Sequence, residues 1–381
     1  MKTRVSELMA SRQNSAAARG LMVSTFHTLG LNILRREYKS LGYRSGFSIF
    51  DAQDSLAVLR DLMGRDFAAD SEHAEQVQWQ ISEWKNQLIL PDKAMQIAEA
   101  GTQMAAAKVY PLYTAALQAY NAVDFDDLIL KPVVLFRENP EVLKKWQARI
   151  HYLLVDEYQD TNGCQYELVK QLVGIREALT VVGDDDQSVY SWRGARPENL
   201  AQLQTDYPRL KLIKLEQNYR SMSRILRVAN TLIRNNPHVF EKQLWSALGE
   251  GDPIRVIGCR DDDHESEKVV SELLYHKLKH QASFKDYAIL YRSNHQSRPI
   301  ERVLREHNVP YFLTGGTSFF SRIEVKDIMA YLRLLANQDD DNAFLRVINT
   351  PRRGIGSSTL QALGNYATER KIGRASCRER V

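Results

Sequence analysis

The sequence predicts an α/β fold in which a mostly helical region precedes a parallel sheet. Residues 20 to 130 have the apolar spacing of amphipathic helices rather than the strict alternation of strands. From residue 150 onward, short apolar runs that end in acidic residues alternate with amphipathic stretches. A strand, a helix and a second strand in this order form the crossover unit that joins parallel strands.

The clearest helix of the first region is the stretch SEHAEQVQWQISEWKNQ. Ser71 can cap its first turn, and Val77, Ile81 and Trp84 fall on one face. This stripe indicates core packing. We therefore do not interpret Trp84, or the nearby Trp79, as a platform for nucleic-acid bases.

The sheet region begins with HYLLVDE, continues with the amphipathic QYELVKQLV and returns to the apolar ALTVVGDDD. This order places both acidic ends at one edge of a parallel sheet, where ligands of such sheets bind. Further candidate strands are KLIKLEQ, IRVIGC and YAILYRS.

The last region is expected to become helical again. DDDHESEKVVSELLYHKLKH begins with acids and ends with bases, as a helix dipole favours. Its apolar side is formed by Val269, Val270, Leu273, Leu274 and Leu278. The paired glycines of TGGTSFF indicate a domain junction, and the helical pattern resumes in DIMAYLRLLANQ.

Length and composition limit the class of protein. At 381 residues, about two to four compact units are expected. No apolar run approaches the roughly 18 residues of a membrane span, and the first twenty residues lack the apolar core of a secretory signal. The three cysteines have neither metal-ligand spacing nor a disulfide pattern, which favours the reducing cytosol.

Net charge says little about partners. The formal charge is +4, but the last eleven residues, KIGRASCRERV, contribute +3 and leave +1 for the other 370. This stretch resembles translated sequencing-adapter DNA, so residues 371–381 are expected to be an artefactual, disordered tail; the alternative is a genuine basic segment. Any argument for DNA binding must therefore rest on local sites.

The residues with the clearest chemistry are two acids that follow an apolar run, Asp156 and Glu157. In nucleotide hydrolysis the first acid of such a pair holds Mg²⁺, and the second polarises the attacking water. Alone, the pair fits a solvated acidic turn equally well. The run LLVDEYQDTN together with the sister strand end GDDDQSVYSWRGA makes the signal strong.

With these blocks, the chain resembles the Rep, UvrD and PcrA group of superfamily 1 DNA helicases, and GDDDQS with TGGTSFF is most similar to the Rep type. The resemblance extends from near residue 1 to about residue 370. The matching blocks are STFHTLG (24–30), FDDLI (125–129), LLVDEYQDTN (153–162), VVGDDDQSVYSWRGA (181–195), LEQNYRS (215–221), AILYRSN (288–294) and TGGTSFFSR (314–322).

The resemblance implies an ATP site that uses Mg²⁺. It implies that Asp156 helps to hold Mg²⁺, that Glu157 is the general base and that Gln187 senses the terminal phosphate. Arg220 would act as an arginine finger, and Tyr219 would stack on adenine. Without the neighbouring blocks, a surface turn for Gln187, a surface ion pair for Arg220 and a packed ring for Tyr219 would be the simpler interpretations.

The resemblance also implies a DNA track directly after the phosphate sensor. Aromatic faces accept bases of any sequence, which suits a motor that does not read sequence. From composition alone a tryptophan packed against the sheet and a core histidine would be favoured. The residues implied to contact DNA are Tyr190, Trp192 and Arg193, with Thr25, Phe26 and His27. A change at Gln187 can then move Trp192, which couples nucleotide state to DNA.

A phosphate-binding loop of the form G-x-x-x-x-G-K-[ST] does not occur, because the chain has no Gly-Lys pair. The family has this loop upstream and further motifs downstream, so we expect a chain truncated at both ends and inactive alone. The expected fold is two incomplete RecA-like lobes of the P-loop NTPase type with two helical insertions. The expected parts are 1–26 and 138–218 for the first lobe, 27–137 for its helical insertion, 219–314 for the second lobe and 315–370 for the second insertion.

The function that the resemblance implies is an ATP-dependent DNA helicase that moves 3′ to 5′ on single-stranded DNA. Its expected partners are single-stranded DNA, duplex junctions and replication proteins, in the cytoplasm near the nucleoid and without a membrane. Two alternatives stay open: a UvrD or PcrA type repair helicase, and a non-catalytic fragment that binds DNA or docks a partner. The missing loop favours the fragment, whereas the intact Asp156, Glu157, Gln187 and Arg220 favour an enzyme.

Overall fold

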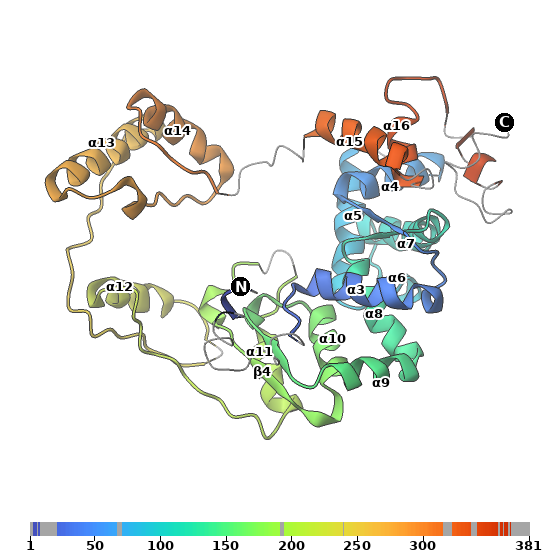
Figure 1. The fold of residues 1–381 in the computed structure, drawn as a ribbon, viewed down its shortest axis with the longest axis horizontal. Helices are drawn as coiled ribbons and strands as arrows, with labels where there is room; N and C mark the ends of the chain where they lie inside the picture. Colours follow the sequence, from blue (N-terminus) through green and yellow to red (C-terminus); the bar gives the residue numbers. More distant parts are fainter. Residues whose placement is uncertain are drawn as a thin grey trace. The chain divides into compact units, whose positions relative to one another are not determined.

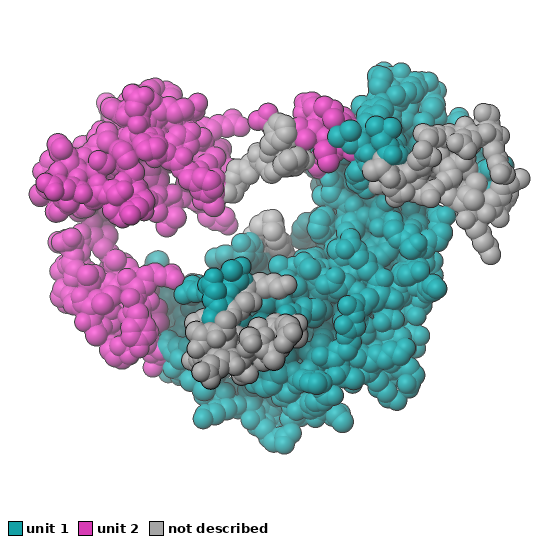
Figure 2. Space-filling model, viewed as in Figure 1, with its two compact units in different colours: residues 1–215, 231–243, 330–381 teal, residues 216–230, 244–329 magenta. Residues whose placement is uncertain are grey.

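The computed structural model contains two compact units (Figure 2). The first comprises residues 1–215, 231–243 and 330–381, and the second comprises residues 216–230 and 244–329. The residues that the structure describes are 3–5, 7, 21–66, 71–190, 194–238, 240–314, 322–336, 341–356, 359–360, 362–364 and 366.

The first part of unit 1 is helical, as expected for residues 20 to 130 (Figure 1). Its helices are α3 (Phe26–Glu37), α4 (Ala52–Asp66), α5 (Ser71–Asn86), α6 (Pro91–Ile97), α7 (Thr102–Ala119), α8 (Asp127–Glu138) and α9 (Pro140–Arg149). The predicted stripe of α5 is buried, and Trp84 stacks on Tyr110 of α7 with 6.2 Å between ring centroids. Trp79 is 58% exposed.

This helical part also contains a parallel pair of strands that the sequence did not predict, β1 (Ser48–Phe50) and β2 (Ala122–Asp124). Each strand has three residues, which is too few to show an alternating pattern. The pair packs against the core that α4, α5 and α7 form, since Phe50 and Ala122 belong to the same buried cluster. α16 (Asp341–Val347) contacts β1 as well.

A buried ion cluster joins α5 to the end of β2. The Lys85 ammonium lies 2.6 Å from Asp124 Oδ2 and 2.9 Å from Asp127 Oδ1, and the Tyr113 hydroxyl donates to Asp124 Oδ2 at 2.9 Å. Burial alone would lower the pKa of Lys85, but the two carboxylates outweigh it and raise that pKa. A lysine on an amphipathic helix usually faces solvent, so its burial follows from its partners rather than from the helical pattern.

The predicted strand–helix–strand unit is present. β3 (Leu153–Val155) pairs in parallel with β4 (Leu179–Val181), and α10 (Gly163–Val173) makes the crossover. The register aligns Val155 with Val181, and the ladder continues when Tyr158 N–H donates to the Val182 carbonyl at 2.9 Å. Both acidic strand ends therefore lie at the same edge of the sheet, with α11 (Glu198–Asp206) following.

Unit 2 contains two helices that pack on each other, α13 (Asp262–His280) and α14 (Ser297–Glu306). Val270 of α13 and Val303 and Leu304 of α14 share a small core. The helix predicted between the candidate strands is thus confirmed, although Leu278 of its apolar side is 82% exposed. α12 (Ser223–Ile233) and α15 (Ile323–Ala336) each have residues in both units. α15 confirms the helical pattern predicted for DIMAYLRLLANQ as far as Ala336, and the last two residues of that stretch lie outside the described residues.

The candidate strands KLIKLEQ, IRVIGC and YAILYRS are a wrong prediction, because no strand forms in them. Leu215, Val256 and Leu290 in these stretches are at least 80% exposed. An alternating apolar pattern predicts which face is buried, but a strand also needs a hydrogen-bonded neighbour. In this part of the described chain, only a single parallel bridge forms, between Gln217 and Trp245.

Several expectations fall on residues outside the described ones, among them the TGGTSFF junction from residue 315 on and the tail from residue 371 on. Within the part of the chain that the structure describes, no helix combines the length and the apolar character that crossing a membrane requires.

Candidate functional site

The first half of the candidate site lies where β3 ends. Asp156 and Glu157 follow the strand directly, and both are exposed. Glu157 has a φ of 52°, in the left-handed region that non-glycine residues rarely adopt. Such strain persists only where the surroundings enforce it, and it is concentrated at functional sites. Exposed carboxylate oxygens at this edge are ligands of the kind that Mg²⁺ prefers.

A buried glutamine links the two strand ends. The Gln159 amide donates to Glu157 Oε2 at 2.8 Å, and its Oε1 accepts the backbone N–H of Asp184 at 3.0 Å. Gln159 is 1% exposed, so the linking side chain is buried although the Glu157 carboxylate that it contacts is exposed. Glu157 after β3 is therefore held in a fixed relation to the loop that follows β4.

The second half of the site is the short 3₁₀ turn of Asp185–Gln187 after β4. Gln187 is exposed, and its side-chain amide donates to Asp184 Oδ2 at 2.7 Å. Glu157, Gln159, Asp184 and Gln187 thus form one continuous hydrogen-bonded path. The structure therefore brings together the predicted base and the predicted phosphate sensor.

The acidic loop after β4 also carries a cation. Lys242 bonds to Asp184, lies 2.5 Å from Asp185 Oδ1 and 3.1 Å from Asp186 Oδ2. Asp185, Asp186 and His238 have the spacing of metal ligands. Because the Lys242 ammonium already occupies this carboxylate cluster, a second cation there would be repelled.

The segment after Gln187 returns to the acidic turn of β3. The backbone N–H of Arg196 donates to the Thr161 carbonyl at 3.0 Å, and the Asn199 amide donates to the same carbonyl at 2.8 Å. The stretch between Gln187 and Arg196 carries Tyr190, which is 43% exposed. Both ends of a short DNA-binding candidate segment are therefore fixed at the nucleotide-site candidate. Trp192 and Arg193 lie outside the described residues.

The first DNA-contact candidates lie at the start of α3. Thr25 caps the helix by accepting the Thr28 backbone N–H at 3.3 Å, and Phe26 is half-buried. His27 lies at the surface, where partial burial lowers its pKa. Its ring lies edge-on to Phe125, with 6.2 Å between centroids, and Phe125 is 53% exposed. The two rings form a neutral aromatic surface.

The remaining candidates belong to unit 2. Asn218 Oδ1 accepts the backbone N–H groups of Arg220 and Ser221 at 2.9 and 2.8 Å, which forms a tight turn. Arg220 and Tyr219 project from this turn and are exposed, Tyr219 by 77%. The Tyr219 hydroxyl donates to Gln217 Oε1 at 2.9 Å. The turn thus presents a cation and an aromatic ring side by side.

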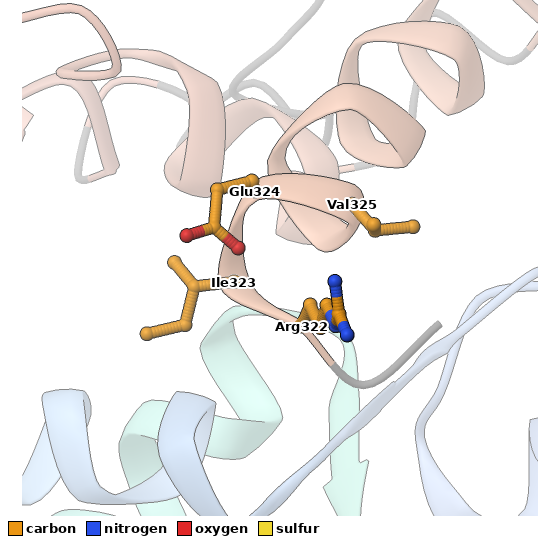
Figure 3. A pocket seen from close by; sticks show the side chains of 4 residues that line it. All are labelled: Arg322, Ile323, Glu324 and Val325. Atoms are coloured by element: carbon orange, nitrogen blue, oxygen red, sulfur yellow. The ribbon is translucent and has the colours of Figure 1, made fainter. Parts of the chain in front are cut away.

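Four residues of the site were missed by the sequence analysis. Gln159 and Phe125 stand inside matched blocks, and Asp184 is the second residue of the GDDDQS block, so their position was the available signal. Lys242 lies in a stretch without a motif, and only its contacts reveal it. A hollow also occurs at the first turn of α15 (Figure 3), around Arg322, Ile323, Glu324 and Val325. Its lining consists of four consecutive residues. Ligand sites instead bring polar groups together from several parts of a chain, so we do not interpret this hollow as a ligand site.

Two protein-family models together match most of the chain. The family model for the UvrD/REP helicase N-terminal domain matches residues 1–208, and the model for the UvrD-like helicase C-terminal domain matches residues 213–373. These helicase domains imply a P-loop NTPase fold.

Among curated proteins, the chain is similar to the ATP-dependent DNA helicase Rep of Escherichia coli strain K12, with 55% identity over 97% of this chain and 54% of that protein. The Rep helicase of Salmonella typhimurium is 54% identical over the same shares. The ATP-dependent DNA helicase PcrA of Staphylococcus epidermidis is 41% identical over 98% of this chain and 50% of that protein. The chain thus spans about half the length of the curated relatives it matches.

Proposed function

The chain belongs to the UvrD/REP helicase family, and we propose that the protein to which it contributes is an ATP-dependent helicase that moves along single-stranded DNA in the 3′ to 5′ direction. The higher identity to Rep than to PcrA favours a Rep-like enzyme over a PcrA type repair helicase. The observation that carries the proposal is the hydrogen-bonded path from Glu157 through Gln159 and Asp184 to Gln187.

The path gives each polar group at the sheet edge a role in ATP hydrolysis. Asp156, exposed at the end of β3, would help to hold Mg²⁺, which supplies charge neutralisation at the phosphates. Glu157 would accept the proton of the attacking water, and Gln159 holds its carboxylate in place. Gln187 would orient water and the terminal phosphate with its neutral amide.

Arg220 and Tyr219 are proposed to act on the same nucleotide from the second lobe. The guanidinium group would stabilise charge on the transferred phosphoryl group, as a planar cation with several donors can. The exposed Tyr219 ring would stack on the adenine. Support comes from the turn around Asn218, which presents both side chains to solvent.

DNA binding is proposed for the surface that carries Tyr190, with Trp192 and Arg193 next to it, and for Thr25, Phe26 and His27 at the start of α3. A segment anchored at Gln187 on one side and at Asn199 on the other can transmit a shift at the phosphate sensor to Tyr190. We propose this segment as the link between nucleotide state and DNA contact.

The proposed architecture consists of two incomplete RecA-like lobes with helical insertions. Residues 1–26 and 138–218 belong to the first lobe, 27–137 to its insertion, 219–314 to the second lobe and 315–370 to the second insertion. Duplex junctions and replication proteins are the proposed partners. Work on chromosomal DNA would place the enzyme in the cytoplasm near the nucleoid.

The test is DNA-stimulated ATP hydrolysis by the full-length protein, compared with Glu157→Gln and with the control Glu141→Gln, which changes an exposed glutamate of α9. Loss of the base is expected to lower kcat by about 10² to 10⁴-fold. Unwinding is expected on duplexes with a 3′ single-stranded tail and not with a 5′ tail. Normal hydrolysis by the Glu157 variant contradicts the proposal.

For the 381-residue chain taken alone, a second candidate function is DNA binding without hydrolysis. The observation that favours it is the absence of a Gly-Lys pair from the sequence, since a phosphate-binding loop requires one. We expect the purified chain to bind a fluorescent single-stranded oligonucleotide while hydrolysing ATP negligibly. DNA-stimulated hydrolysis at a normal rate by this chain would exclude the second candidate.

A further inference from the structure

The acidic loop after β4, Asp184 to Asp186, is contacted by a second segment of unit 1, residues 238–242. His238 Nδ1 lies 2.9 Å from Asp186 Oδ1, and the Phe240 backbone N–H donates to Asp185 Oδ2 at 3.4 Å. With Lys242, which bonds to Asp184, every second residue of this segment contacts one of the three consecutive aspartates. The segment follows α12, the helix that begins just after the Arg220 turn.

Of these three contacts, Phe240 is uncharged and His238 is positive only when it is protonated. Lys242 therefore supplies the permanent positive charge. Its ammonium bonds to Asp184 and lies 2.5 Å from Asp185 Oδ1 and 3.1 Å from Asp186 Oδ2. Burial alone would lower the pKa of Lys242, but the hydrogen bonds that its ammonium donates to the three carboxylates raise that pKa above its ordinary value. Three adjacent carboxylates repel one another, so the loop needs this cation to keep its shape.

Asp184 divides its two oxygens between Lys242 and Gln187. Oδ1 bonds to the ammonium, and Oδ2 accepts the Gln187 side-chain amide at 2.7 Å. An ionised carboxylate can only accept hydrogen bonds, so Gln187 must turn its NH₂ group toward Asp184 and its Oε1 away from it. The orientation of the amide is thus set by Asp184, whose side chain is held by Lys242 and by the Asp186 backbone N–H, which donates to Asp184 Oδ1 at 3.2 Å.

We propose that Lys242 is a positioning residue for the phosphate sensor: through Asp184 it fixes the Gln187 amide with its carbonyl oxygen facing the nucleotide. This inference rests on the proposed function, because Gln187 needs a phosphate to sense. It adds a residue that lies in none of the matched sequence blocks.

The structural half of the inference can be tested on the 381-residue chain without any activity. Lys242→Met is compared with Lys242→Arg and with the control Lys211→Met, which changes an exposed lysine. Hydrogen exchange is followed by mass spectrometry at the amides of Gln187 and Ser188, which donate within the loop. We expect about 10- to 100-fold faster exchange in the methionine variant, partial recovery with arginine and no change in the control.

The catalytic half is tested by kinetics of the full-length protein. Lys242→Met is expected to lower the kcat of DNA-stimulated ATP hydrolysis by about 10- to 100-fold, the range for a misplaced group, with KM for ATP little changed. In a Gln187→Ala background the same substitution should cause no further loss, because it acts through Gln187. Rescue by Lys242→Arg should be partial.

The two experiments fail in different ways. Unchanged exchange at Gln187 and Ser188 in Lys242→Met overturns the positioning role, whatever the enzyme does. An equal loss of kcat in the wild-type and Gln187→Ala backgrounds also overturns it, since Lys242 would then act independently of the sensor. If the unsubstituted full-length protein lacks ATPase activity, the proposed function fails, and hydrogen exchange alone decides whether Lys242 orders the loop.

Discussion

The Asp184 backbone N–H donates to Gln159 Oε1 at 3.0 Å, and this hydrogen bond ties the acidic loop after β4 to a side chain of the turn after β3. Because the Gln159 amide simultaneously donates to Glu157, its side chain uses both of its polar ends. A buried amide that satisfies both ends is costly to replace, because an apolar substitute leaves two partners unpaired.

Replacement of Gln159 by Leu is therefore expected to affect both stability and catalysis. Glu157 Oε2 and the Asp184 N–H lose their hydrogen bonds to Gln159. We therefore expect the free energy of unfolding to fall by about 1 to 3 kcal/mol. In the full-length protein we expect kcat to fall more than stability alone explains. Urea unfolding and ATPase assays give the two numbers, and Gln202→Ala in α11 is the control. Retention of kcat would show that the path between Glu157 and Gln187 is not needed.

The buried cluster around Lys85 predicts a large effect on stability alone. Lys85→Met removes the ammonium and leaves Asp124 and Asp127 as adjacent buried carboxylates, which is expected to cost about 3 to 5 kcal/mol. Thermal or urea unfolding of the 381-residue chain measures the loss. Lys93→Met changes an exposed lysine of α6 and should have little effect. If both variants unfold alike, the cluster does not hold α5 to β2.

How far the sequence predicts the structure depends on the range of the interactions. The β3–α10–β4 unit and α5 were predicted, because each is encoded in a local apolar pattern. β1 and β2 were missed because three residues carry no period, and KLIKLEQ was assigned wrongly because pairing depends on a distant neighbour.

The candidate site divides in the same way. Glu157 and Gln187 were predicted to share one sheet edge, and the hydrogen-bonded path joins them there. Gln159 and Lys242 were not predicted, because the residue type alone does not indicate which partner a glutamine or a lysine contacts in the folded chain. Their roles depend on contacts 25 and 58 residues apart in the chain.

Asp126 is expected to make stability depend on pH. Burial, with the nearby charge of Asp124, raises the pKa of Asp126 to about 6. In the unfolded chain this carboxyl titrates near pH 4, so between roughly pH 4 and 6 the unfolded state loses its proton first and is favoured. The contribution of Asp126 to stability therefore falls as pH rises through this window and stays low above it.

Replacement by Asn removes this penalty and keeps an acceptor for Asn86, whose amide lies 3.3 Å from Asp126 Oδ1. Relative to wild type, Asp126→Asn should be more stable by about 2 to 3 kcal/mol above pH 6, with the gain vanishing near pH 4. Urea unfolding at several pH values measures the difference, with Asp92→Asn as an exposed control. A gain that does not change with pH would rule out titration of Asp126 as its source.

The aromatic surface of His27 and Phe125 leads to a prediction about DNA binding. Phe125 is 53% exposed and touches the His27 ring edge-on, so its face can accept a stacked base. Loss of one base-stacking ring is worth about 1 to 3 kcal/mol, so Phe125→Ala should weaken binding of a single-stranded oligonucleotide by roughly 5- to 150-fold.

Trp79→Ala removes a similarly exposed ring from α5 and should leave affinity unchanged. Fluorescence anisotropy at fixed salt measures both, since phosphate contacts vary with ionic strength. Equal losses in the two variants would mean that bases do not stack at the His27 surface in particular.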